Sequence, residues 1–134
     1  MNGVVALRTV LIADVALIAL VPAARIAAGV MPQGTALPAI SITSVSTNDL
    51  NIPNPATTRM VTERVQVTVM AGTYPEQKTI LAAVKRAAAD TRPTVSGIAN
   101  VTIHTENTGP DFMNDGASIY LGSLDFRVIY NETR

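Results

Sequence analysis

Apolar and polar positions alternate along the chain with two different periods, and they predict two helices and four strands. The final strand, residues 123–130, is the clearest case, because its apolar positions recur at every second residue. Leu124, Phe126, Val128 and Tyr130 share one face, and Asp125 and Arg127 share the other. The pattern predicts a strand that lays one face on a core and carries charges on the opposite face. In chain order, the elements read helix, strand, strand, helix, strand, strand.

The first segment, residues 3–20, has the ~3.6-residue period of an amphipathic helix. Its large apolar side chains form a stripe of Val4, Leu7, Leu11, Val15 and Ile18, widened on one flank by Val5 and Ile12. The opposite side is mostly alanine, and it is either exposed to solvent or covered by another subunit. Arg8 and Asp14 border the stripe on opposite edges. Each of them should therefore reach water or find a partner outside this helix.

Two strands follow, separated by a long polar segment. The first is short, around residues 40–42, and the second spans residues 59–71. The positions that point inward are Ile40 and Ile42 in the first strand and Val65, Val67 and Val69 in the second. Residues 47–58 between them are rich in Pro and Asn, and they exceed an ordinary hairpin connection of about 2–5 residues. We therefore expect an exposed loop here, which would act as a functional projection.

A capping box marks the start of the second helix. Thr73 can accept a hydrogen bond from the backbone near Glu76, and Pro75 lies in the first turn, where its missing N–H costs nothing. The buried stripe comprises Ile80, Leu81, Val84 and Ala87. Residues 90–93 should end this helix.

The last third predicts two more strands joined by a second polar loop, residues 107–116. Residues 98–105 form a strand with Val101 and Ile103 inward. Ile119 and Leu121 differ in parity from Leu124 and Phe126, which predicts a bulge near Gly122.

This order of elements predicts an α+β fold. The sheet would be antiparallel or mixed, with about four to five strands, and two main helices would pack on one face. A chain of 134 residues is long enough for one hydrophobic core. We therefore expect a single domain, residues 1–134.

Charge and cysteine content narrow the classes of function. The chain has 10 basic and 10 acidic side chains and no basic run. A nucleic-acid-binding surface needs clustered Lys and Arg to displace counterions, so direct DNA binding is disfavoured. The absence of cysteine excludes disulfides and thiolate chemistry, and it fits a protein made in the cytosol.

Residues 1–24 are apolar enough to raise the question of a leader or a membrane span. Arg8 and Asp14 interrupt the segment, and no uncharged run reaches the ~20 residues that a span needs. The basic start of a signal peptide is missing, although Pro22-Ala23-Ala24 loosely resembles a cleavage region. We expect a core helix. The alternative, a secreted or membrane-tethered domain, predicts cleavage near Ala24.

No set of residues points to catalysis, a cofactor or a metal. His104 is the only histidine, and it shares the expected solvent side of its strand with Thr102 and Glu106. Asp111, Asp115, Glu106 and nearby Asn residues make an acidic loop, but they lack the spacing and the terminal bidentate Glu of a calcium-binding EF-hand. Phosphate-binding and nucleophile motifs are also missing. The sequence predicts no enzyme and no cofactor.

Several blocks, taken in order, resemble the phage tail-completion family, which includes the tail terminators of long-tailed phages and related particles. The blocks are the opening helix from Ala6-Leu7-Arg8 to Leu20-Val21, then Arg25-Ile26, Pro32-Gln33-Gly34 and Leu37-Pro38-Ala39-Ile40, then Arg64 to Val69, Tyr74, Val84 to Ala88, Leu124 to Val128, and Tyr130. The resemblance spans nearly the whole chain. It departs from the family at Ala27 and Ala39, where members often carry an aromatic residue.

The resemblance implies a structural virion protein of the neck region of the tail, assembled in the host cytoplasm. Such a subunit joins copies of itself in a ring, usually a hexamer, on the end of the tail tube. The ring stops tube polymerisation and offers a surface to a head–tail connector or head-closure protein. DNA passes through the lumen without specific binding, and no membrane is involved. The main alternative is another neck or tail component of the same particle, such as a head-closure or tail-tube protein.

The ring implied by the resemblance needs contact surfaces, and two kinds of segment are candidates. One is the polar loop between the two middle strands, and the other is the set of charged side chains on the first helix and the strands. The candidate interface residues are Arg8, Asn48, Asp49, Leu50, Asn51, Ile52, Asn54, Arg64, Asp125 and Arg127.

Overall fold

The computed structural model of the protein describes residues 2–29, 36–53, 56–114 and 119–133. Its helices are α1 (Asn2–Ala13), α2 (Val15–Leu20) and α3 (Tyr74–Ala88), with a short 3₁₀ turn at Ala23–Arg25. Its strands are β1 (Ile26–Ala28), β2 (Ala39–Asp49), β3 (Thr58–Ala71), β4 (Ile98–Thr108), β5 (Phe112–Asn114) and β6 (Ile119–Thr133). Within the described residues, no helix is long and apolar enough to cross a membrane.

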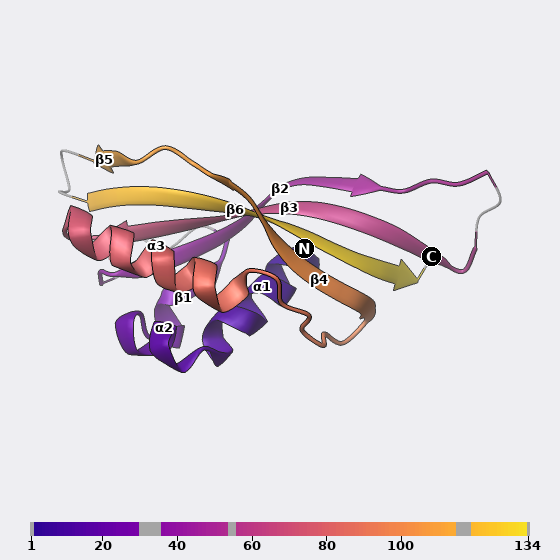
Figure 1. Ribbon diagram of the computed structural model, residues 1–134, viewed down its shortest axis with the longest axis horizontal. Helices are drawn as coiled ribbons and strands as arrows, with labels where there is room; N and C mark the ends of the chain where they lie inside the picture. The colour runs from indigo at the N-terminus through magenta and orange to yellow at the C-terminus, as the bar shows by residue number, and fades with distance from the viewer. Residues whose placement is uncertain (1, 30–35, 54–55, 115–118, 134) are drawn as a thin grey trace.

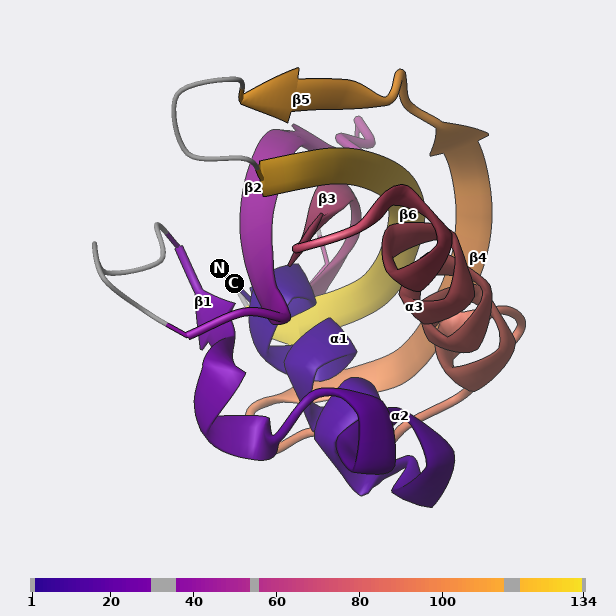
Figure 2. The same ribbon diagram turned by 90° about the vertical axis from the view of Figure 1, so that its left-hand side faces the viewer.

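The strands form one six-stranded sheet in the order β1-β2-β3-β6-β4, with β5 paired to the start of β6. β1 runs parallel to β2, and all other pairs are antiparallel. The helices lie on one face, and the sheet curls around them (Figures 1 and 2). The predicted α+β class is confirmed. The short strands β1 and β5 make the sheet larger than expected.

The core fills the space between the helices and the helix-side face of the sheet. Val65 of β3 pairs with Phe126 of β6, and Val67 pairs with Leu124, so the apolar positions of both strands meet on this face. The predicted facing of these two strands is confirmed, because the inward side chains are buried. No helix of the described residues lies on the opposite side of the sheet (Figure 2). We call it the open face, and its central residues are Arg64, Gln66 and Thr68 of β3 with Asp125 and Arg127 of β6.

The predicted first helix is divided into two at Asp14. The Asp14 side chain accepts a hydrogen bond from the Leu17 backbone N–H at 2.9 Å and so caps α2. We had expected Asp14 to reach water or to find a partner outside its helix, and its partner is instead the backbone of α2, within the predicted segment. The break also rotates α2 relative to the predicted stripe, so Leu17 is buried whereas Val15 is 85% exposed.

Helix α3 starts as predicted. The Thr73 hydroxyl accepts from the Glu76 backbone N–H at 3.3 Å, and Ile80, Leu81 and Val84 are buried. Its packing against β6 explains Gly122, where we had predicted a bulge. The β3–β6 register runs through Gly122 without a shift, so that prediction was wrong. A Cβ there would lie 2.3 Å from Gln77 Nε2 and 2.8 Å from Leu81 Cδ1, so glycine permits close approach of the helix.

The predicted loop 47–58 is shorter than expected. β2 continues to Asp49, which pairs with Val61, and β3 already begins at Thr58. The two strands form a hairpin that extends beyond the helices (Figure 1, right). Backbone pairing therefore holds much of the segment that composition assigned to a loop.

The second polar loop, residues 107–116, is also partly regular. β4 extends to Thr108, and residues 112–114 form β5 against Ile119–Leu121 of β6. Only the connection around residues 109–111 remains irregular within the described residues. Asp115 and Gly116 lie outside them.

Candidate assembly surfaces

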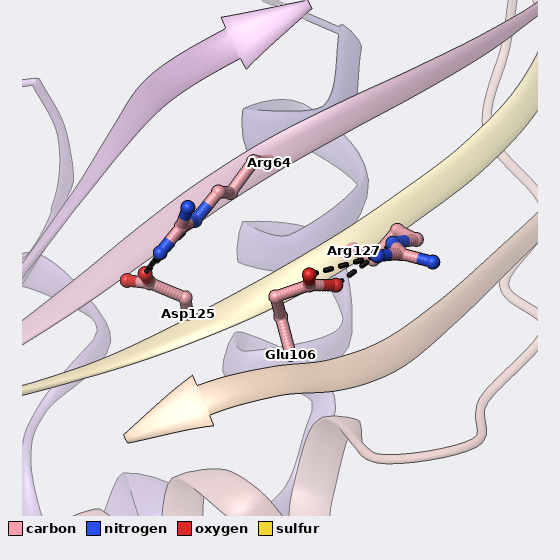
Figure 3. A network of polar contacts seen from close by, with 4 residues as sticks. All are labelled: Arg64, Glu106, Asp125 and Arg127. Atoms are coloured by element: carbon pink, nitrogen blue, oxygen red, sulfur yellow. Dashed lines mark hydrogen bonds and ion pairs between the residues drawn. The ribbon is translucent and has the colours of Figure 1, made fainter. Parts of the chain in front are cut away.

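The open face carries two arginines that are direct cross-strand partners, Arg64 on β3 and Arg127 on β6. Like charges in such positions repel each other. Arg64 Nε donates to Asp125 Oδ2 at 3.0 Å, and Arg64 Nη2 donates a second bond to the same oxygen (Figure 3). Arg127 is bound by Glu106, with 2.7 Å from Nε to Oε2 and 2.8 Å from Nη2 to Oε1. Both arginines are therefore neutralised within the subunit.

Glu106, which binds Arg127, lies at a bulge in β4. The β4–β6 register shifts between Thr105 and Asn107, which leaves Glu106 as the extra residue. A bulge re-aims a side chain locally. Each arginine is thus paired with a carboxylate on a neighbouring strand, and a bulge is present on β4, whereas we had predicted one at Gly122.

Asp125 faces the open side as predicted, but it is not exposed. Its relative exposure is 4%, and its Oδ1 atom has no hydrogen-bond partner among the described residues. The other carboxylate oxygen, Oδ2, accepts both hydrogen bonds from Arg64. The alternation of apolar and polar residues predicts which face of the sheet a side chain lies on, but it does not predict how exposed that side chain is.

Several of the predicted interface residues gather in one hollow on the open face. Ser46, Asn48, Thr62, Arg64, Glu106 and Arg127 line a space of about 350 Å³. The hollow therefore joins the base of the hairpin to the centre of the sheet, and three of the candidates, Asn48, Arg64 and Arg127, meet there.

The hairpin carries most of the other candidates. All of residues 44–53 are exposed, and Leu50 and Ile52 present half-exposed apolar side chains near its tip. Asp49 pairs with Arg59 across the hairpin at 3.0 Å, and the Leu50 N–H donates to the Met60 carbonyl at 2.9 Å. Asn51 lies on the exposed segment after β2, and Asn54 is outside the described residues. A rigid arm with an apolar tip is suited to contact another protein.

Arg8 does not join this group. It lies on α1, on the helix side of the sheet, and its Nε donates to the Ile26 carbonyl at 2.9 Å. The prediction that it needs a partner outside its helix is confirmed. That partner is the entry to β1, so the visible role of Arg8 is to hold the chain between α1 and the sheet.

The sequence reading missed Glu63, a carboxylate in the core. Its Oε1 accepts from the Gly3 backbone N–H at 3.1 Å and from the Tyr130 hydroxyl at 3.0 Å. Burial, with the charge of Glu63 beside it, raises the pKa of Tyr130. A Cβ on Gly3 would lie 2.7 Å from Glu63 Cδ, so glycine lets α1 start against this side chain. The alternation along β3 could have identified Glu63 as an inward residue, because Glu63 lies on the same face of the strand as Val65 and Val67.

Asp111 fastens the β4–β5 connection to the first turn of α3. Its carboxylate accepts from the Tyr74 hydroxyl at 2.9 Å and from Gln77 Nε2 at 3.4 Å, and it lies 2.7 Å from Lys78 Nζ. The hydrogen bond from Lys78, followed by that from Tyr74, lowers the pKa of Asp111. The same bond raises the pKa of Lys78. The acidic residue that we considered for calcium is therefore a structural tether.

Among the described residues, no three His, Cys, Asp or Glu side chains come together as a metal site. His104 is half-exposed, as expected, with Nδ1 3.2 Å from Asp90 Oδ1.

A family model described as tail completion protein gp17 matches residues 5–131, which is nearly the whole chain. The chain belongs to this family of tail completion proteins. The match confirms the resemblance drawn from the sequence blocks. It makes the protein a structural component of a phage-like virion tail and not an enzyme.

A solved structure of a virion of a native gene transfer agent particle contains a chain with the same fold as this tail completion protein. The TM-score is 0.71 at 17% sequence identity, and the alignment covers 96% of this chain and 93% of the other. At this identity the likeness is one of fold. No curated protein sequence matches the chain.

Proposed function

We propose that this tail completion protein forms a ring on the head-proximal end of the tail tube, stops tube polymerisation there, and joins the tail to the head connector. The observation that carries the proposal is the family match over residues 5–131. We take the ring to be a hexamer of identical subunits. A ring of this kind uses a heterologous interface that closes by rotation. The other neck and tube proteins are competing assignments.

The charge of the open face supports a role beside moving DNA. Free arginines along a passage would bind phosphates and slow the DNA. Arg64 and Arg127 are instead held by carboxylates of the same subunit. The tail completion protein can therefore surround DNA without gripping it at these positions.

The hairpin supports contact with the tube or with the connector. Its apolar side chains Leu50 and Ile52 are exposed, while β2 and β3 hold the arm in place by backbone pairing. The hairpin extends past the helix layer, so a change at its tip leaves the core intact (Figure 1). We propose that this tip is a contact surface of the assembled neck.

Purified tube protein, polymerised with and without this protein, tests the proposal. Addition of this protein should stop tube growth, and electron micrographs should find it at one end of each tube. A tube protein would instead extend the tubes or form tubes alone, and a head-closure protein would leave their length unchanged. Either result would overturn the terminator assignment.

Two variants test the hairpin. Leu50→Ser with Ile52→Ser should keep the melting temperature within about 2 °C, because both side chains are already exposed, and should reduce tail joining at least tenfold. Val15→Ser is the matched control, because Val15 is more exposed still and lies on α2. If the hairpin variant joined tails as well as this control did, the tip would have no role in joining.

A further inference from the structure

The sheet has two free edges, one on β2 and one on β4. In the part of the chain that the structure describes, β1 pairs with β2 only as far as Ile42, and no strand follows beside residues 43–49. β4 is the last strand on the other side of the sheet. Natural sheets protect a free edge with charged side chains such as lysine, with proline, with a bulge or with a covering segment. The chain has neither lysine nor proline within β2 or β4.

The hydrogen bonds of β2 identify the backbone groups that point to its free side. The Ile42 carbonyl accepts from Gly29 and so faces β1, whereas Leu50 donates to Met60 and so faces β3. Along a strand, the backbone N–H and C=O groups of successive residues point alternately to one side and to the other. The β2–β3 register shifts between Ser44 and Ser46, which leaves Val45 as the extra residue. The backbone groups that point to the free side are therefore those of Ser44 before this shift and of Thr47 and Asp49 after it.

The same counting applies to β4. Ile103 points away from β6, because its N–H donates to the Thr91 carbonyl, and Gly109 points towards β6, because its N–H donates to the Ser123 carbonyl. With Glu106 as the extra residue, the outward groups that remain are those of Thr105 and Thr108. Ile103 is already used within the subunit, so the free part of this edge is residues 105–108.

The two edges match. Each includes a pair of outward residues three positions apart with one bulged residue between them. The pair is Ser44 and Thr47 on β2, and Thr105 and Thr108 on β4. Each of β2, β3, β6 and β4 runs antiparallel to its neighbour, so β2 and β4 point in opposite directions. A β4 edge placed beside a β2 edge in the continued plane of the sheet would therefore form another antiparallel pair.

The side chains at the two edges do not oppose this pairing. Ser44, Val45, Ser46 and Thr47 are small and uncharged. On β4, Glu106 is already paired with Arg127. A shallow hollow of about 310 Å³, lined by Lys85, Leu124 and residues 105–108, lies beside the β4 edge and has room for small side chains.

We propose that the partner of the β2 edge is a second copy of this chain, which adds its β4 edge in antiparallel register, with Thr47 beside Thr105 and Ser44 beside Thr108. The inference rests on the proposed ring and specifies how its subunits join. Repeated around the ring, this contact uses a different edge of each neighbour, so it is heterologous and can close. It also satisfies the outward backbone groups of Ser44 and Thr47 on one subunit and of Thr105 and Thr108 on the next.

A pair of cysteines tests the register. The chain has none of its own, so Thr47→Cys with Thr105→Cys introduces the only thiols. Directly hydrogen-bonded antiparallel residues have Cα atoms about 5.5 Å apart, which suits a disulfide. In oxidised tails that contain the double variant, non-reducing gels should resolve a ladder of linked subunits up to the full ring, which reductant collapses to monomer.

Two controls keep the result specific. A mixture of the two single-cysteine proteins should stop at dimers, because each subunit then carries one thiol and can form only one disulfide. The pair Thr47→Cys with Ala82→Cys, which moves one thiol to the exposed side of α3, should give no ladder. If rings visible by electron microscopy contained the double variant without linkage, edge pairing would be overturned and the ring would stand. If tails carried no ring at all, both proposals would fail.

Proline provides a second readout that does not depend on oxidation. The Thr47 N–H points to the free edge, so Thr47→Pro should leave the β2–β3 ladder and the melting temperature nearly unchanged and should abolish ring formation. Asn48→Pro should instead weaken the hairpin itself, because the Asn48 N–H faces β3. Normal rings from Thr47→Pro would overturn the proposal.

Discussion

The same two strands, β3 and β6, build two faces that are stabilised in different ways. On the helix side, Val65, Val67 and Phe126 are wholly buried against the helices. On the open side, Arg64 and Arg127 remain partly exposed and are held by Asp125 and Glu106. Apolar burial contributes several kcal/mol for each large side chain, whereas a surface ion pair contributes about 0–1 kcal/mol. The helix side should therefore determine stability, and the open side should remain available for assembly.

The largest expected effect is at Phe126. Phe126→Ala leaves a cavity between β6 and the helices, and truncation of a buried Phe costs about 3–5 kcal/mol. Denaturant unfolding should register this loss, against about 0–1 kcal/mol for Arg127→Ala on the open face. Equal losses of unfolding free energy at the two positions would mean that Phe126 and Arg127 have been assigned to the wrong faces of β6.

A smaller loss is expected at Gly122. Gly122→Ala brings a Cβ to 2.3 Å from Gln77 Nε2, so α3 must move or Gln77 must rearrange. Overpacking of this kind costs about 1–3 kcal/mol. Gly72→Ala is the matched control, because nothing lies within 4 Å of its Cβ position, and it should be neutral. A neutral Gly122→Ala in thermal melts would contradict the close approach of α3 to β6.

On the open face, Asp125→Ala should cost only about 1 kcal/mol despite the burial of Asp125. The substitution removes a desolvated carboxylate, and its partner Arg64 is 43% exposed and can return to water. Double-mutant cycles with Arg64→Ala would measure the coupling between the two side chains. A loss comparable with that at Phe126 would mean that the ion pair is part of the core.

The smallest effect is a pH dependence at Asp111. Its pKa lies below the ordinary value of about 3.9, so the stabilisation by its ion pair is present above that value and is lost as the pH falls through the lowered pKa. Asp111→Asn should therefore lower the melting temperature slightly at pH 6, and the difference from the wild type should shrink below about pH 4. A difference that grew on acidification would contradict this assignment.

Local sequence signals predicted the parts of this fold that depend on neighbours in the chain. Alternation identified the faces of β3 and β6, and the capping box located the start of α3. The division at Asp14 was missed, because an aspartate fits both an exposed helical position and an N-cap. β5 was missed because its three residues are ordered by pairing with β6, which no local pattern encodes.

The candidate surfaces were predictable to a similar degree. Polarity and proline content identified the hairpin segment as a candidate contact surface. The alternation of the strands placed Arg64, Asp125 and Arg127 on one face of the sheet. The pairing of Arg127 with Glu106 joins β6 to β4 at a bulge, and Asp125 is buried by residues that are distant in the sequence. Both are tertiary features. Arg8 was grouped with these residues on charge alone, and its position beside Ile26 separates it from them.

Electron cryomicroscopy of complete particles tests the central claim most directly. The account predicts one closed ring of this protein per tail, six copies at the head-proximal end of the tube, with neighbouring subunits joined through β2 and β4. Copies distributed along the tube, or a single copy per particle, would contradict the claim that the protein ends the tube as a ring.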